Sequence, residues 1–134
     1  MYCFDTDVLS ATMRRDPPLG LIRKLALVPP AEQFTTAITL GEIIYGAVKR
    51  ESDELVASVR ELVLSGISVL PFDRSAAEVY GRLRARLERE GRRLAEPDLR
   101  IASIALARDL TLVTGNIRHF GRVPDLKIEN WLPA

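Results

Sequence analysis

The sequence has little of several features that mark particular classes of protein. It contains one cysteine, Cys3, and one histidine, His119, among 134 residues, which excludes an internal disulfide and a zinc site built from paired cysteine and histidine ligands. We expect Cys3 to be a buried, unreactive thiol. No apolar run reaches the ~18–20 residues of a membrane-spanning helix, and no glycine-rich phosphate-binding loop is present. These absences predict a cytoplasmic protein without membrane contact or nucleotide hydrolysis.

Neither sign of charge dominates the chain. It has 19 Lys and Arg residues against 18 Asp and Glu residues, which gives a net charge of +1. No overall field attracts nucleic acid, so any binding of a polyanion has to come from a local patch. The length of 134 residues fits the ~100–200 residues of one domain, and we expect residues 1–134 to form it.

Short apolar stretches alternate with amphipathic ones along the whole chain, which is typical of an α/β protein. The stretches that predict strands are 2–4, 34–38, 67–72, 110–114 and 126–131. The periodic stretches that predict helices are 8–15, 19–26, 39–48, 52–64, 73–91 and 97–106. This order predicts a central, mainly parallel sheet of four to five strands, flanked by helices on both faces.

Oxygen-bearing side chains follow two of the predicted strands or lie near the start of a helix. They are Asp5, Asp7, Glu42, Asp98, Thr114 and Asn116. Because parallel strands bring their carboxyl ends to one edge of a sheet, we expect these groups to converge. Carboxylates so close together repel one another unless a cation or a proton compensates them. Oxygen donors of this kind suit Mg²⁺ or Mn²⁺ far better than zinc.

Each candidate residue also has a purely structural interpretation. Asp7 could cap the first helix, and Glu42 follows Thr39 at the spacing of a capping box. Asp98 could complement the dipole of its helix, and Asn116 could be a turn residue. These alternatives stay open for single residues. Several carboxylates at one edge nevertheless favour a metal site, which could activate water and clamp the oxygens of a phosphodiester.

Arginine residues crowd the stretch before Asp98. The members are Arg82, Arg84, Arg86, Arg89, Arg92 and Arg93, interrupted by only two acids, Glu88 and Glu90. They form either a solvated helix face or a patch that follows the phosphates of a nucleic acid towards the acidic edge. The residues we expect to contact RNA are Arg82, Arg86, Arg89, Arg93 and, after Asn116, Arg118.

Four segments resemble those of the PIN-domain ribonucleases, and most closely those of the VapC toxins of prokaryotic toxin–antitoxin pairs. They are Asp5-Thr6-Asp7, Glu42 on an apolar helix, the run 98–102, and the run 112–116 followed by Phe120. The resemblance covers nearly the whole chain. It implies a PIN-like fold and a Mg²⁺- or Mn²⁺-dependent endoribonuclease that cleaves structured RNA such as tRNA or rRNA. It also implies a homodimer, and neutralisation by a cognate VapB-type antitoxin, with which the toxin could form a larger hetero-oligomer.

The resemblance further implies roles for individual residues. Asp5, Glu42 and Asp98 would be the metal-binding acids of the catalytic centre. Thr6 would orient the carboxylates, Thr114 would supply a hydroxyl beside the metal, and Asp7 would be an outer-shell residue or an alternative fourth acid. Asn116 occupies a position where many PIN domains carry a fourth acid, a departure that leaves open whether one or two metal ions bind.

Two other functions are compatible with parts of the pattern. An Asp-x-Asp motif after an apolar strand also resembles haloacid-dehalogenase-like phosphatases, but these need a lysine late in the chain, and none occurs between Lys49 and Lys127. A non-catalytic module that binds RNA or protein is the second alternative. The retained carboxylates argue against it, because a binding module has no reason to tolerate their repulsion.

Overall fold

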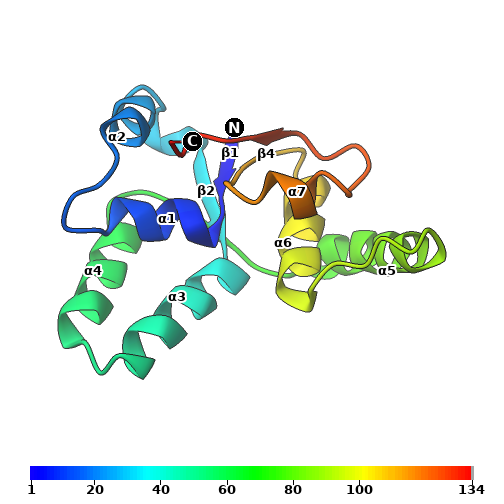
Figure 1. Ribbon diagram of the computed structural model, residues 1–134, viewed down its shortest axis with the longest axis horizontal. Coiled ribbons are helices and arrows are strands. Elements are labelled where there is room, and N and C mark those ends of the chain that lie inside the picture. The colour runs from blue at the N-terminus through cyan, green and yellow to red at the C-terminus, as the bar shows by residue number, and fades with distance from the viewer. Residues whose placement is uncertain (134) are drawn as a thin grey trace.

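The computed structural model describes residues 1–133, except for the side chains of Val63 and Leu64. The elements confirm the predicted alternation (Figure 1). In order they are β1 (Tyr2–Phe4), α1 (Thr6–Thr12), α2 (Leu19–Ala26), a 3-10 turn (Pro30–Glu32), β2 (Gln33–Thr36), α3 (Ala37–Lys49), α4 (Asp53–Leu64), β3 (Ser68–Leu70), α5 (Arg74–Arg89), α6 (Glu96–Ala107), β4 (Thr111–Val113), α7 (Ile117–Phe120) and β5 (Ile128–Glu129). The 3-10 turn and α7 were not predicted, because each is too short for hydrophobic periodicity to reveal it.

All five strands belong to one parallel sheet with the order β3-β2-β1-β4-β5. The α/β prediction is therefore confirmed. The chain first builds the sheet outwards from β1 to β3, and then returns to the other side of β1 with β4 and β5. Ligand sites of open parallel sheets lie beyond the carboxyl ends of strands where the order reverses in this way. That point falls between β1 and β4.

Helices cover both faces of the sheet, as predicted. Alternate residues of β1 point to opposite faces, so Cys3 joins the core cluster beneath α5 and α6, while Phe4 joins the cluster beneath α1 to α4. Figure 1 shows these two groups of helices on opposite sides of the strands. Cys3 is fully buried; this burial and the nearby charge of Asp5 raise the pKa of its thiol to about 12. The expectation of an unreactive thiol agrees with this environment.

Two helix starts differ from the prediction. Asp5, not Asp7, is the N-cap of α1 and accepts a hydrogen bond from the Thr6 N–H. Thr36, not Thr39, caps α3, because the last residue of β2 has extended backbone and its hydroxyl accepts from the Thr39 N–H. The alternative interpretation of Glu42 as the capping-box partner of Thr39 is therefore wrong, and the Glu42 side chain is free to bond elsewhere.

Two other boundaries are close to their predictions. Asp73, the first residue of the predicted helical stretch 73–91, caps α5, and Gly91 follows that helix with a positive φ of 66°, a conformation that favours glycine. No helix within residues 1–133 is both long and apolar enough to cross a membrane.

Candidate acidic active site

The site begins at the carboxyl ends of the two neighbouring strands β1 and β4. The backbone N–H of Asp5 donates to the Val113 carbonyl at 3.0 Å, which extends the strand pairing by one residue. Asp5 and Thr114 follow their strands directly and are buried, with 5% and 0% of their surface exposed. Both side chains are therefore held by a rigid backbone at the reversal point of the sheet.

Asp5 is a buried carboxylate with hydrogen bonds to both oxygens. The Thr114 hydroxyl donates to Oδ2 at 2.8 Å, and the Thr6 N–H donates to Oδ1 at 2.7 Å. Burial raises the pKa of Asp5 to about 6, with smaller contributions in the same direction from the charges of Asp7 and Asp98, although the two hydrogen bonds oppose the rise. Deprotonated Asp5 is therefore short of compensating positive charge.

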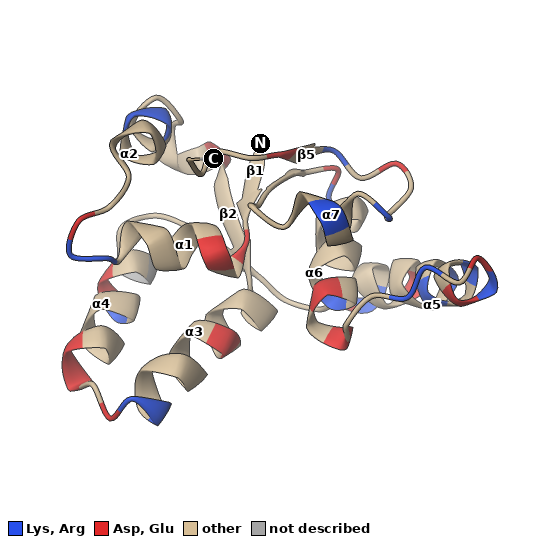
Figure 2. Cartoon of the chain, viewed as in Figure 1, with Lys and Arg blue, Asp and Glu red and all other residues tan. Residues whose placement is uncertain are grey.

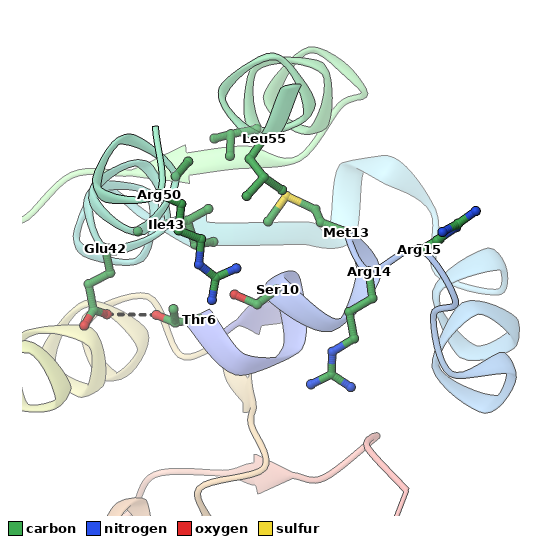
Figure 3. Close-up of a pocket in the computed structure, with 12 residues that line it drawn as sticks. Thr6, Ser10, Met13, Arg14, Arg15, Glu42, Ile43, Arg50 and Leu55 are labelled. Atoms are coloured by element: carbon green, nitrogen blue, oxygen red, sulfur yellow. Dashed lines mark hydrogen bonds between the residues drawn. The ribbon is translucent and has the colours of Figure 1, made fainter. Parts of the chain in front are cut away.

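Thr6 connects the opening segment to α3. Its hydroxyl donates to Oε1 of Glu42 at 2.8 Å, across 36 residues of sequence, and this contact is drawn in Figure 3. The side chain of Glu42 is exposed, and this bond holds it beside Thr6, the residue that follows Asp5. The expected role of Thr6 as a residue that orients a carboxylate stays a prediction, and this bond supports it.

Asp98 lies in the first turn of α6, on the other side of the edge. Burial raises its pKa, and the negative charges of Glu42 and Asp7 raise it further, while His119 acts in the opposite direction. Asp98 therefore lies close enough to Glu42 and Asp7 for their charges to affect its protonation. Figure 2 shows acidic positions on α1, α3 and α6 around this edge.

The Thr114–Asn116 segment closes the site on the side of β4. The Asn116 N–H donates to the Thr114 hydroxyl oxygen at 3.0 Å. The Asn116 side-chain oxygen lies 2.6 Å from Nδ1 of His119, so its side chain turns towards the imidazole. Sequence reasoning had no role for His119 here; the available signal was the three-residue spacing from Asn116, which places the two on one face of a helical turn.

Asp7 neither caps α1 nor points to solvent. Its Oδ2 accepts a hydrogen bond from the Gly115 N–H at 2.9 Å. Its Oδ1 is buried and has no hydrogen-bond partner among the described residues. A buried carboxylate oxygen without a partner is costly, and such an atom needs an explanation in a native structure.

The donor chemistry of the site fits a hard divalent cation. Asp5, Glu42, Asp98 and Asp7 supply only carboxylate oxygens, the ligands that Mg²⁺ and Mn²⁺ prefer. The unpartnered Oδ1 of Asp7 and the raised pKa values of Asp5 and Asp98 both indicate a deficit of positive charge. Within residues 1–133, no three Asp, Glu, His or Cys side chains are placed closely enough to hold a metal ion as they stand.

The structure brings few of the predicted RNA-contacting arginines to this edge. Arg82, Arg86 and Arg89 lie on α5, which extends away from α1 and α3 (Figures 1 and 2). Arg86 pairs with Glu90 at 3.1 Å, and the Arg93 carbonyl accepts a bond from Arg122. Arg118 lies on α7, two residues after Asn116.

A groove that sequence reasoning missed adjoins the acids. It runs between α1, α3 and α4, has a volume of about 480 Å³, and has Thr6 and Glu42 among its lining residues. Figure 3 shows the Arg50 side chain reaching from α3 towards Ser10, with Arg14 on the α1 side. Apolar side chains, among them Met13 and Leu55, complete the lining. No local motif marks these residues, because they meet only when the helices pack.

Known proteins resemble the chain over nearly its whole length. The family model of the PIN domain matches residues 2–126. Ribonuclease VapC2 of Rickettsia felis is 33% identical over 132 residues, 98% of each chain. The tRNA(fMet)-specific endonuclease VapC of Shigella flexneri is 35% identical over 130 residues, 97% of each. The crystal structure of VapBC2 from Rickettsia felis, bound to a DNA fragment from their promoter, matches with a TM-score of 0.86, 32% identity and 98% coverage of each chain.

Proposed function

Because the chain belongs to the VapC family of PIN-domain ribonucleases, we propose that it is a metal-dependent endoribonuclease that acts as the toxin of a toxin–antitoxin pair. The observation that carries the proposal is the convergence at one sheet edge of Asp5, Glu42, Asp98 and Asp7, which influence one another electrostatically. Family membership supports a nuclease and argues against the phosphatase alternative.

The residues of the chain prepare the site in a defined way. Thr114 and the Thr6 backbone orient Asp5, while the Thr6 hydroxyl orients Glu42. Asp98 completes the acidic edge from the side of α6. We infer that Asp5, Glu42 and Asp98 hold Mg²⁺ or Mn²⁺, with Asp7, Thr114 and Asn116 in supporting roles. When bound, such a cation supplies positive charge to a phosphodiester and activates water for in-line attack.

The relatives and the geometry support a proposal for the substrate class. One relative is named for its action on tRNA(fMet), and Glu42, one of the acids of the site, is exposed to solvent. We therefore propose structured RNA, tRNA or rRNA, as the substrate. A cationic surface has to contact its phosphates, and Arg118 is the predicted contact nearest to Asn116 in the chain.

The proposed partner is a VapB-type antitoxin. The solved relatives include VapBC complexes, and the groove between α1, α3 and α4 reaches the acidic site. Its apolar side chains and the exposed arginines Arg14 and Arg50 suit a peptide with apolar and acidic residues. A cationic side chain of that peptide would also suit the carboxylates of the site.

Cleavage of a defined RNA tests the proposal. Purified protein is incubated with a transcribed initiator tRNA and with a ribosomal RNA fragment, in Mg²⁺, Mn²⁺ or EDTA, and the new 5′ ends are sequenced. We expect cleavage at few positions in either metal, and none in EDTA or with Asp5→Asn. The exposed Asp16 supplies the matched control, since Asp16→Asn removes the same charge outside the site.

Two results would contradict the proposal in different ways. Cleavage that survives both EDTA and Asp5→Asn would refute the metal site. Tight RNA binding without cleavage in either metal would instead favour the non-catalytic binding module. The antitoxin groove is tested separately by co-expressing the chain with a VapB-type antitoxin. We expect the two proteins to co-purify, and the double substitution Arg14→Glu with Arg50→Glu to abolish this.

A further inference from the structure

Asp7 links the opening acidic segment, residues 5–7, to the backbone of the segment after β4, residues 114–116. Its Oδ2 accepts from the Gly115 N–H at 2.9 Å, although the two residues are 108 positions apart. A carboxylate that accepts from a backbone N–H forms one of the stronger classes of hydrogen bond. The contact therefore fixes the position of Gly115 relative to α1.

Gly115 is shaped for this contact. A Cβ atom at this position would lie 2.8 Å from Oδ2 of Asp7 and 2.8 Å from a methyl carbon of Leu132. Real Cβ atoms essentially never lie this close to another heavy atom, so the loop or the side chains of Asp7 and Leu132 would have to move. Glycine at position 115 thus allows the close approach of Asp7.

The residues on both sides of Gly115 belong to the site. Thr114 donates to Asp5 at 2.8 Å, and its hydroxyl oxygen accepts from the Asn116 N–H at 3.0 Å. A shift of Gly115 would move the backbone of both neighbours and disturb the hydrogen bond that orients Asp5. Loss of the bond between Asp7 and Gly115 would therefore change the position of Asp5 through the movement of Thr114.

From this geometry we propose that Asp7 is a positioning residue, which clamps the Thr114–Asn116 segment through the Gly115 N–H and so holds the Thr114 hydroxyl against Asp5. The inference rests on the proposed function of the same site. It assigns Asp7 neither to the cap of α1, which Asp5 provides, nor to the metal-binding set. The unpartnered Oδ1 makes direct metal binding the competing role.

Asparagine separates the two roles. In Asp7→Asn an amide oxygen still accepts the bond from Gly115, but the negative charge that a metal ligand needs is gone. In Asp7→Ala both the acceptor and the charge are lost. Amide hydrogen exchange at Gly115, followed by NMR in EDTA, measures how firmly the Gly115 N–H is held and does not depend on catalytic activity. Asp16→Asn is the charge-matched control.

We expect Gly115 to exchange about 10–100-fold faster in Asp7→Ala than in the wild type. Most of the protection should remain in Asp7→Asn. RNA cleavage should follow the same order, with kcat at least about tenfold higher in Asp7→Asn than in Asp7→Ala. The Mn²⁺ affinity, measured by calorimetry, should stay within about threefold of the wild type in Asp7→Asn, because the bond to Gly115 is kept and Asp7 is not a ligand. In Asp7→Ala it should fall by about 10–100-fold, because Asp5 is no longer held in position.

Several results would overturn the clamp. Unchanged exchange at Gly115 in Asp7→Ala would show that the bond does not hold the loop. Loss of Mn²⁺ affinity in Asp7→Asn, as severe as in Asp5→Asn, would identify Asp7 as a metal ligand. If Asp7→Ala does not fold, Gly115→Ala disturbs the same contact from the other side and should lower kcat, while unchanged kcat in that variant would count against the clamp.

The experiments can refute the positioning role of Asp7 and the proposed function independently of each other. If the wild-type protein cleaves no RNA in either metal, the proposed function is wrong, but the exchange measurement still decides whether Asp7 holds Gly115. If the wild type cleaves RNA and exchange at Gly115 is insensitive to Asp7, only the clamp is wrong.

Discussion

At the residue scale, the buried carboxylate of Asp5 sets how the site responds to pH. Its pKa is raised from an ordinary value of 3.8 to about 6 by burial and by neighbouring negative charge. The folded protein therefore holds this proton more tightly than the unfolded chain does. The contribution of protonated Asp5 to stability is lost as pH rises from about 4 to about 6, and ionised Asp5 destabilises the metal-free fold above that range.

Asp5→Asn should accordingly stabilise the metal-free protein. At pH 7.5 in EDTA we expect the free energy of unfolding to rise by up to about 3 kcal/mol, the equivalent of a shift from 3.8 to about 6. At pH 5 the gain should be smaller, because much of Asp5 is then protonated already. Urea unfolding at the two pH values measures the gain in the free energy of unfolding. An equal gain at both pH values would contradict a raised pKa of Asp5.

The same pKa predicts how metal binding depends on pH. Protons compete with Mn²⁺ for the Asp5 carboxylate, so affinity should be highest above pH 6 and fall by up to about tenfold per unit below it. Calorimetric titrations between pH 5 and pH 7.5 measure this dependence. A constant affinity across that range would show that Asp5 is not among the ligands.

At the element scale, the start of α3 places Glu42. Thr36 is fully buried, ends β2, and accepts from the Thr39 N–H at 3.0 Å. Thr36→Ala should lower the free energy of unfolding by about 1–2 kcal/mol. Thr36→Ser should recover most of that loss because it keeps the hydroxyl. Thermal and urea unfolding compare the variants, and equal losses in both would indicate that packing of the methyl group matters more than the cap.

At the scale of the whole molecule, the outer surface of α3 is apolar. The hydrophobic periodicity of residues 39–48 includes Ile44 and Val48, yet these side chains are 39% and 60% exposed, and the neighbouring Tyr45 is 65% exposed. The homodimer implied by the resemblance stays a prediction, and this surface supports it.

We expect Tyr45→Glu with Val48→Glu to shift the molar mass from dimer to monomer in light scattering. Leu19→Glu, at an exposed site on α2, is the control, and an unchanged mass would exclude this face.

The arrangement of the arginines leads to a second prediction at this scale. The α5 residues Arg86 and Arg89 extend away from the acidic edge, whereas Arg118 follows Asn116 on α7. Arg118→Glu should therefore raise the KM for RNA more than Arg89→Glu does, since phosphate contacts near the site fix how the RNA is oriented there. Cleavage kinetics at two salt concentrations measure the difference, and a larger effect of Arg89→Glu would restore the α5 patch as the main contact.

Much of the architecture was predictable from local patterns. Apolar runs and amphipathic periods identified all five strands and six of the seven α-helices within residues 1–133, because burial of one face imposes those periods on the sequence. Boundaries were less predictable. Thr36 and Thr39 are both plausible caps, and only the end of β2 decides between them.

The sequence by itself determined the α/β class and the acidic residue set, since hydrophobic period and side-chain chemistry are local properties. The tertiary structure decided what each acid contacts: Asp5 caps α1 and meets Thr114, Glu42 meets Thr6, and Asp7 meets the Gly115 backbone. The contacts with Thr114, Thr6 and Gly115 join residues that lie 36 to 109 positions apart in the sequence. Such contacts depend on strand order and on how α1, α3 and the β4 end pack, which no local pattern encodes.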